Sequence, residues 1–290
     1  MEIENQYISV MGFLYSGSSA VLDYIKQFDG LGFMSKDETR LFVNGMSELY
    51  ELKKQGKEPT ENQYEKIRRI FSGDFDESLY GFSGNMKINK NMFKGIDTKK
   101  ASKLVDKFLK EIKGDDVKKF ILSAREFIDN FCSLKVSEKI RIFNNDPGAS
   151  LVDTTLLFNK NKAIIVYRDI CDQFLDQINH GVSLYKEPIV NIENAKIFID
   201  MINWKIKLFL RDIEFIKKYN SSRLNNIYIV SFEDFIKNKK TRDDIGIFLG
   251  LSNPKFKTFF PEKSMLNIGI SKNMSQEIRD YIMSEVKIKQ

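Results

Sequence analysis

A glycine- and serine-rich loop near the N-terminus carries the clearest chemical pattern in this chain. It reads GFLYSGSS over residues 12–19 and lies between an apolar run, Tyr7–Met11, and an apolar-periodic stretch, Ala20–Ile25. This order predicts a strand, a tight loop and a helix, with the backbone N–H groups of the loop at the positive end of the helix dipole. The pattern therefore indicates an anion site, most often one for phosphate.

The residue types inside the loop refine this interpretation. Gly12 and Gly17 let the backbone curl close to an anion, and Ser16, Ser18 and Ser19 add hydroxyl donors. The loop has Gly-Ser-Ser where the loops of nucleoside triphosphatases have Gly-Lys-Ser/Thr, and it contains no lysine. It therefore predicts phosphate binding without ATP hydrolysis.

An arginine forms a second candidate anion site. Arg168 directly follows the continuously apolar run Ala163–Tyr167, which is typical of a strand buried on both faces. A guanidinium at the carboxyl end of a strand can clamp a phosphate with two parallel hydrogen bonds. The alternative is a surface ion pair with Asp169 or Asp172. The presence of the N-terminal loop favours the phosphate clamp.

Four motifs together make the chain resemble the sulfotransferases that use 3′-phosphoadenosine-5′-phosphosulfate (PAPS). They are the loop Gly12–Ser19, Val166-Tyr167-Arg168-Asp169, the pair Ser231–Phe235 and Phe248–Leu251, and Asn267–Lys272. The resemblance covers residues 7–42 and about 140–285. Asn144–Pro147 is similar to the Asn-Lys-Asp-Pro of tyrosylprotein sulfotransferases, with Asn145 in place of the lysine. The resemblance points to a bacterial, carbohydrate- or tyrosylprotein-like branch.

The resemblance implies a donor site that binds PAPS and releases 3′,5′-ADP. The loop would hold the 5′-phosphosulfate, Arg168 the 3′-phosphate, and Lys272 would contact the phosphates. The implied nucleotide-binding residues are Gly12, Tyr15, Ser16, Gly17, Ser18, Ser19, Arg168, Asp176 and Lys272. Such transfer needs no metal, and no His/Cys/Asp cluster of metal-ligand type is evident.

Besides Asn145, two further positions depart from the family pattern. Tyr15 stands where the family has a lysine or arginine that neutralises charge as the sulfuryl group leaves. Arg40, Arg125 and Lys272 are candidates to replace that cation. Asp176 stands where the family has a serine, eight residues after the 3′-phosphate arginine. An acid there repels a 3′-phosphate unless it points away.

The resemblance also suggests which residues carry the chemistry. Sulfuryl transfer to a hydroxyl needs a general base, and Glu38 matches the glutamate of bacterial members, with Arg40 facing the acceptor or the sulfate. His180 is the reserve base, or a phosphate ligand when protonated. The alternatives are that residues 36–40 form a charged loop and that His180 is a helix-surface residue.

Apolar periodicity predicts the elements that position these residues. Strands are expected at Tyr7–Met11, Ala163–Tyr167 and Asn226–Ser231, with a weaker candidate at Lys139–Phe143. Helices are expected from Thr98 as N-cap to Gly114, and over Phe120–Phe131, Asn194–Tyr219 and Asp243–Leu249. We therefore expect an α/β fold, a central parallel β-sheet flanked by helices, in a single domain over residues 1–290 with a helical insertion at 43–138.

Charge is concentrated in one segment of the chain. Lys87–Lys119 holds eleven lysines and five acidic residues, an excess equal to the whole net charge of +6. The segment is either a solvated helical face or a surface for an anionic polymer or membrane headgroups. The absence of interleaved aromatic residues argues against nucleic acid. A polar N-terminus, no apolar run of membrane-span length and two cysteines without a metal pattern favour a cytoplasmic protein, or one peripheral at the inner membrane face.

The leading hypothesis is a cytoplasmic sulfotransferase that moves a sulfuryl group from PAPS to a hydroxyl of a carbohydrate, glycolipid or small metabolite. One alternative is a P-loop transferase of another group, of phosphoryl type. The other is a non-catalytic nucleotide- or glycan-binding module. The sequence does not identify the acceptor or the oligomeric state.

Overall fold

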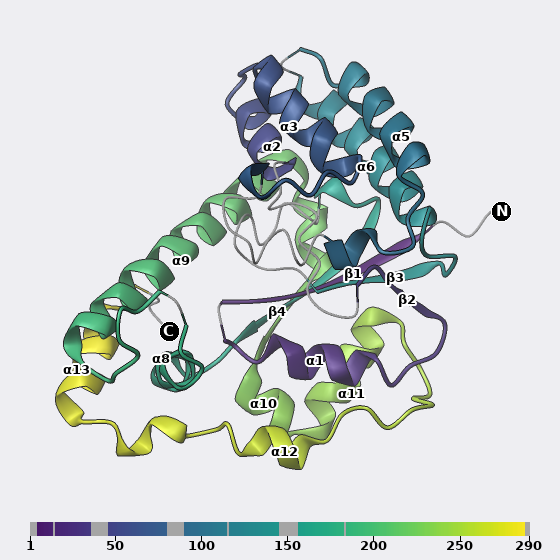
Figure 1. Cartoon of the computed structure of the whole chain (residues 1–290). Coiled ribbons are helices and arrows are strands. Elements are labelled where there is room, and N and C mark those ends of the chain that lie inside the picture. Colours follow the sequence, from purple (N-terminus) through teal and green to yellow (C-terminus); the bar gives the residue numbers. More distant parts are fainter. Residues whose placement is uncertain are drawn as a thin grey trace. The chain divides into compact units, whose positions relative to one another are not determined.

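The computed structural model describes residues 5–13, 15–35, 46–79, 90–114, 116–144, 156–182 and 184–287. Within them, five strands form a parallel sheet flanked by helices, in the order β2-β3-β1-β4-β5 (Figure 1). The expected α/β fold with a parallel sheet is therefore confirmed. The strands are β1 (Gln6–Gly12), β2 (Leu31–Phe33), β3 (Ile140–Asn144), β4 (Lys160–Tyr167) and β5 (Ile227–Ser231).

The helices of the described residues fall into two runs along the chain. After β1 come α1 (Ser18–Ile25), α2 (Met46–Lys54), α3 (Glu61–Phe71), the 3₁₀ turn η1 (Glu77–Leu79), α5 (Thr98–Glu111) and α6 (Val117–Ser133). After β4 come α8 (Ile170–Asn179), α9 (Ile192–Asn220), η2 (Ser221–Asn226), α10 (Phe232–Lys237), α11 (Lys239–Leu249), α12 (Pro261–Met265), η3 (Ile270–Asn273) and α13 (Gln276–Glu285). None of these helices is long and apolar enough to cross a membrane.

The short strand β2 is the strand that the sequence did not predict. It pairs in parallel with β3, with Leu31 opposite Ile140. Three residues are too few to show a periodic pattern, so its place follows from pairing alone. A Cβ atom on Gly32 would lie 2.0 Å from Cγ1 of Val136, so only glycine allows this close approach.

The ends of the helices are set by local side-chain chemistry. The expectation that Thr98 caps α5 is wrong by one residue, because the Asp97 carboxylate accepts from the N–H groups of Lys99 and Lys100. Asp116 caps α6 in the same way. A carboxylate accepts two amides and also favours the positive end of the helix dipole, so it caps better than a threonine here. Gly250 ends α11 in the left-handed region, at φ 75°.

The chain divides into two compact units. The first consists of the described residues of 1–9 and 30–163. In it α5 packs on α3 and α6, and α2 packs on α6. Contacting aromatic rings fill its helical core, namely Tyr50, Phe71, Phe93, Phe108, Phe120, Phe127 and Phe131. The described residues of 43–138 form helices, whereas their status as an insertion in a single domain stays a prediction.

The second unit consists of the described residues of 10–29 and 164–290. It contains the carboxyl ends of β1, β4 and β5, where ligands bind in open parallel sheets. Here α13 packs on α8 and α9, η3 packs on α8, and α10 packs on α11 and α12. The second unit therefore contains both strand ends with a predicted anion site: the end of β1 at Gly12 and the end of β4 at Tyr167, directly before Arg168.

Candidate nucleotide-binding site

The loop between β1 and α1 has the backbone of an anion site. Tyr15 (φ 48°) and Gly17 (φ 85°) both lie in the left-handed region, which curls the chain between the two elements. Such turns gather N–H groups into a concave surface that binds anions. Gly17 is the N-cap of α1 and offers no side chain, so no cap occupies the first turn of the helix. The positive end of α1 is thus left available to an external anion.

Two glycines are required by close packing around the loop. A Cβ atom on Gly12 would lie 1.7 Å from Ser16 Oγ. At Gly17 it would lie 2.2 Å from the ring of Phe232, the first residue of α10. The loop therefore folds over its own serine on one side and against α10 on the other.

Ser16 is the most informative side chain of the loop. It is 1% exposed, and its Oγ has no hydrogen-bond partner among the residues that the structure describes. Leaving a buried hydroxyl unsatisfied costs about 1–3 kcal/mol. In native proteins such an atom calls for a partner that protein atoms do not supply, such as a water, an ion or a ligand. Ser18 and Ser19 lie in the first turn of α1, where Ser18 is half-buried and Ser19 is exposed.

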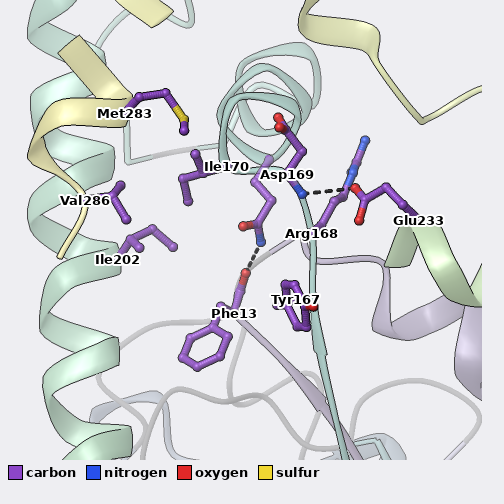
Figure 2. A pocket seen from close by; sticks show the side chains of 10 residues that line it. Phe13, Tyr167, Arg168, Asp169, Ile170, Ile202, Glu233, Met283 and Val286 are labelled. Atoms are coloured by element: carbon purple, nitrogen blue, oxygen red, sulfur yellow. Dashed lines mark hydrogen bonds between the residues drawn. The ribbon is translucent and has the colours of Figure 1, made fainter. Parts of the chain in front are cut away.

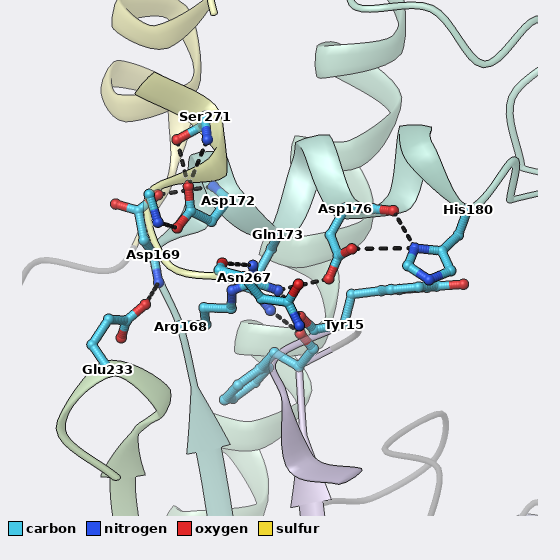
Figure 3. Close-up of polar contacts among 12 residues, drawn as sticks. Tyr15, Arg168, Asp169, Asp172, Gln173, Asp176, His180, Glu233, Asn267 and Ser271 are labelled. Atoms are coloured by element: carbon cyan, nitrogen blue, oxygen red, sulfur yellow. Dashed lines mark hydrogen bonds and ion pairs between the residues drawn. The ribbon is translucent and has the colours of Figure 1, made fainter. Parts of the chain in front are cut away.

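Arg168 is buried at the carboxyl end of β4, and most of its donors are already used (Figure 3). Its Nη1 donates to the carbonyl of Tyr15 at 3.2 Å and to Oδ2 of Asp176 at 2.7 Å. Its Nη2 donates to the carbonyl of Asn267. The guanidinium carbon lies 5.1 Å from the ring centroid of Phe232. Only Nε is buried without a partner.

The two acids nearest in sequence are not the ion-pair partners of Arg168, which corrects that alternative. Asp169 instead caps α8, accepting from the N–H of Asp172 at 2.9 Å, while its own N–H donates to Glu233 at 3.0 Å. Asp172 is 1% exposed and accepts from the N–H of Gly269 and from the N–H and hydroxyl of Ser271. These bonds tie α8 to the segment that carries Lys272.

Asp176 points toward Arg168, rather than away from it. The carboxylate is shared, because its Oδ1 lies 3.2 Å from Nδ1 of His180. His180 is the C-cap of α8; its side chain is 59% exposed, and its ring lies 5.3 Å from that of Tyr15. Tyr15, Arg168, Asp176 and His180 therefore form one contiguous cluster (Figure 3).

The remaining candidate residues belong to other elements or lie outside the described residues. Lys272 is exposed in η3, which Asp172 ties to α8. Arg125 belongs to the first unit, where its Nε donates to the carbonyl of Leu156 at 2.7 Å. Glu38 and Arg40 lie outside the described residues. Among the residues that the structure does describe, no group of three His, Cys, Asp or Glu side chains could hold a metal ion.

A cavity of about 570 Å³ lies beside Arg168 in the second unit (Figure 2). Apolar side chains from α8, α9, α13 and the chain after α13 line much of it, including Ile170, Ile202, Met283 and Val286. Its polar lining includes Glu233 and Gln173, whose side-chain amide donates to the carbonyl of Phe13. The cavity therefore combines an apolar wall with polar groups from α8, from α10 and from Arg168 and Asp169 after β4.

Sequence reasoning missed several polar residues of this site. The bonds made by Asp172, Gln173 and Asn267 were not predicted, because each joins groups between 97 and 160 positions apart, although Asp172 and the segment Asn267–Lys272 were named in other roles. Phe232 and Glu233 belong to the motif after β5, where a role against the loop could have been suspected.

Comparisons with known proteins give weak likenesses only. No family model matches the chain, and no curated protein matches its sequence. Among solved structures, the chain is similar to the sulfotransferase domain of the Synechococcus PCC 7002 olefin synthase, with TM-score 0.46, 12% identity, and coverage of 98% of this chain and 95% of that one. It is also similar to the sulfotransferase STF1 of Mycobacterium tuberculosis H37Rv, with TM-score 0.41, 13% identity, and coverage of 97% and 71%. A third is the mouse sulfotransferase SULT7A1 complexed with PAP, with TM-score 0.35, 11% identity, and coverage of 98% and 68%. At these TM-scores the likenesses carry no argument of their own.

Proposed function

We propose that this chain is a sulfotransferase that binds PAPS between the loop 12–19 and Arg168 and transfers the sulfuryl group to a hydroxyl. One observation carries the proposal. Two buried polar atoms, Ser16 Oγ and Arg168 Nε, have no partner in the described ranges and lie at the carboxyl ends of the neighbouring strands β1 and β4. A ligand with two anionic groups, such as a nucleotide phosphorylated at both ends of its ribose, can satisfy both.

At the loop, the proposed role is to hold and stabilise a phosphate. Ser16 donates its hydroxyl, and the uncapped first turn of α1 supplies N–H groups and a partial positive charge. The bound donor supplies an activated sulfuryl group. Donors fixed in place before the reaction stabilise the charge that grows on the phosphate side as the bond to sulfur breaks.

The loop carries no cation of its own. Tyr15 is 39% exposed, and a phenol can donate a hydrogen bond but brings no positive charge. We assign the missing charge to Lys272, because it belongs to the same unit as the loop and because Asp172 fixes the segment that carries it. Arg40 is the other candidate, by its place in the sequence.

A general base must take the proton from the acceptor hydroxyl during the transfer. We propose Glu38 for this role, with Arg40 beside it, both from the resemblance of residues 35–42 to bacterial members. His180 is the reserve, because its exposed ring adjoins Tyr15 at the edge of the loop. A positioned base contributes about 10²–10⁴-fold in rate.

The proposed acceptor is a hydroxyl of a carbohydrate, glycolipid or small metabolite. The lysine-rich segment supports an anionic polymer or membrane surface as partner, because α5 presents exposed lysines at 99, 100, 103, 107 and 110. Some of this charge is neutralised locally, since Lys107 pairs with Glu126 at 2.6 Å and Lys113 pairs with Glu61 at 3.4 Å. The proposed location, cytoplasmic or at the inner membrane face, rests on sequence alone.

The test is a transfer assay read by mass spectrometry, with PAPS and a panel of carbohydrate and glycolipid acceptors. We expect a sulfated acceptor and 3′,5′-ADP, with the rate reduced about 10²-fold or more in Glu38→Gln. Product formed only from a phosphoryl donor would instead identify a transferase of another group. Tight nucleotide binding without turnover, unaffected by Glu38→Gln, would indicate a non-catalytic binding module.

A further inference from the structure

The chain places a carboxylate on the arginine that is proposed to bind the 3′-phosphate. We propose that Asp176 is a specificity-determining residue of the nucleotide site: by holding Arg168, it weakens the binding of a 3′-phosphate relative to a free 3′-hydroxyl. This inference rests on the proposed function. It predicts that the chain discriminates little between 3′,5′-ADP and 5′-ADP.

Most N–H groups of Arg168 already have acceptors within the protein. Both N–H groups of Nη1 are engaged, one by Asp176 and one by the carbonyl of Tyr15. Nη2 donates to the carbonyl of Asn267, which leaves Nε as the buried atom without a partner. A phosphate on Nε and the second N–H of Nη2 would bind a guanidinium whose other three N–H groups already donate to acceptors of the protein.

The carboxylate of Asp176 would also repel a phosphate bound to Arg168. A phosphate on Nε would share a single positive charge with the carboxylate 2.7 Å from Nη1. The Arg168 side chain is 1% exposed and that of Asp176 17% exposed, so water screens the repulsion only partly. An opposite charge within about 4–6 Å shifts a protonation equilibrium by about one to three pKa units, or about 10- to 1,000-fold, and a like charge acts in the opposite direction. We expect a penalty toward the lower end of that range.

The same carboxylate suits an unphosphorylated ribose. Carboxylates accept hydrogen bonds from ribose hydroxyls in dinucleotide-binding sites, where an arginine instead accommodates a phosphate. Asp176 therefore penalises the phosphate and can bond the hydroxyl. Both effects lower the preference for 3′,5′-ADP.

The test compares two nucleotides on a set of variants by calorimetry. Dissociation constants for 3′,5′-ADP and 5′-ADP are measured for the wild-type protein and for the variants Asp176→Asn, Asp176→Ser and Asp200→Asn. We expect both Asp176 variants to tighten 3′,5′-ADP about 10-fold or more and to leave 5′-ADP unchanged or weaker. Asp200, an exposed acid on α9, is the matched control for the loss of one negative charge, and we expect no change there.

A second variant covers the case in which an Asp176 variant loses its fold. His180→Lys keeps the Arg168–Asp176 pair and sets a permanent cation beside it, at a side chain that is 59% exposed. We expect this variant also to tighten 3′,5′-ADP selectively, because the added charge offsets the carboxylate.

The outcomes separate the inference from the proposed function. Unchanged affinity for 3′,5′-ADP in folded Asp176→Asn and His180→Lys, or a wild-type preference for it of about 10³-fold or more, overturns the inference and leaves the donor site standing. If neither nucleotide binds the wild type or any variant, the donor site and the inference are both overturned.

Discussion

The two ends of the candidate nucleotide site use their donors in opposite ways. At the β1 end, Ser16 Oγ and the first turn of α1 have no side-chain acceptor within the described part of the chain. At the β4 end, Arg168 is held by the carboxylate of Asp176 and by two backbone carbonyls. Donors at the β1 end can therefore bind an external anion, whereas the positive charge at the β4 end is largely neutralised by the protein itself.

The difference follows from the free energy lost when each buried group has no partner in the ligand-free protein. An unsatisfied buried hydroxyl costs about 1–3 kcal/mol, which a folded domain can tolerate. An unpaired buried guanidinium costs several kcal/mol. A buried arginine therefore needs a counter-ion in the free protein, and Asp176 provides it at the expense of affinity for a second phosphate.

The largest effect is expected from Gly17→Ala, which tests the β1 end. The new Cβ would meet the ring of Phe232 at 2.2 Å, and the backbone is left-handed there. We expect a loss of stability of about 3 kcal/mol or more, seen in denaturant unfolding, together with loss of nucleotide binding. Gly181→Ala is the matched control, because Gly181 also has positive φ (59°) but has no atom within 4 Å of its Cβ position. Equal effects at both glycines would contradict the packing argument.

The next effect tests the β4 end. Arg168→Met leaves Asp176 without its cation, so we expect the free energy of unfolding to fall by about 3 kcal/mol. The double variant Arg168→Met/Asp176→Leu should recover most of this loss, because both charges are then gone. A double-mutant cycle by denaturant unfolding measures the coupling. A coupling near zero would show that Asp176 does not compensate the arginine.

Ser16→Ala should separate binding from stability. Removing a hydroxyl that bonds nothing leaves the stability of the free protein unchanged or slightly higher. Binding of 3′,5′-ADP should weaken about 10-fold, because a hydrogen bond to a charged group contributes about 1.5–3 kcal/mol. Calorimetry and thermal melting of the same samples check both. A clear loss of stability without a change in affinity would assign the hydroxyl a structural role.

The smallest effect concerns Cys171 on α8. Burial, and then the charge of Asp169, raise the pKa of its thiol to about 11, and burial raises that of Cys132 to about 12. Both thiols stay protonated at pH 8, so we expect slow reaction with a thiol reagent in the folded protein and fast reaction in denaturant. Since the folded-state pKa values exceed the unfolded ones, their effect on stability is absent below about pH 8.5 and lowers it as pH rises toward 11–12. Fast labelling in Asp176→Asn alone would show that α8 has loosened, and that the affinity changes there do not report charge.

The strands and the loop could be predicted because their signals are local. β4 ends in the continuous apolar run Ala163–Tyr167, and Gly17 supplies a left-handed turn directly before a helix. The Thr98 cap was wrong by one residue because neighbouring Asp97 and Thr98 can both cap a helix. β2 was missed because three residues carry no periodicity.

The sequence by itself determined that an anion loop follows β1, that an arginine follows β4, and that a parallel sheet presents both. Tertiary structure alone decided how those groups are used. Asp176 faces Arg168 because α8 turns its side chain toward the strand end, and Asn267 and Ser271 reach the site from almost a hundred residues away. Composition and spacing record which side chains exist, whereas the partner of each buried charge is fixed only when distant segments are folded against one another.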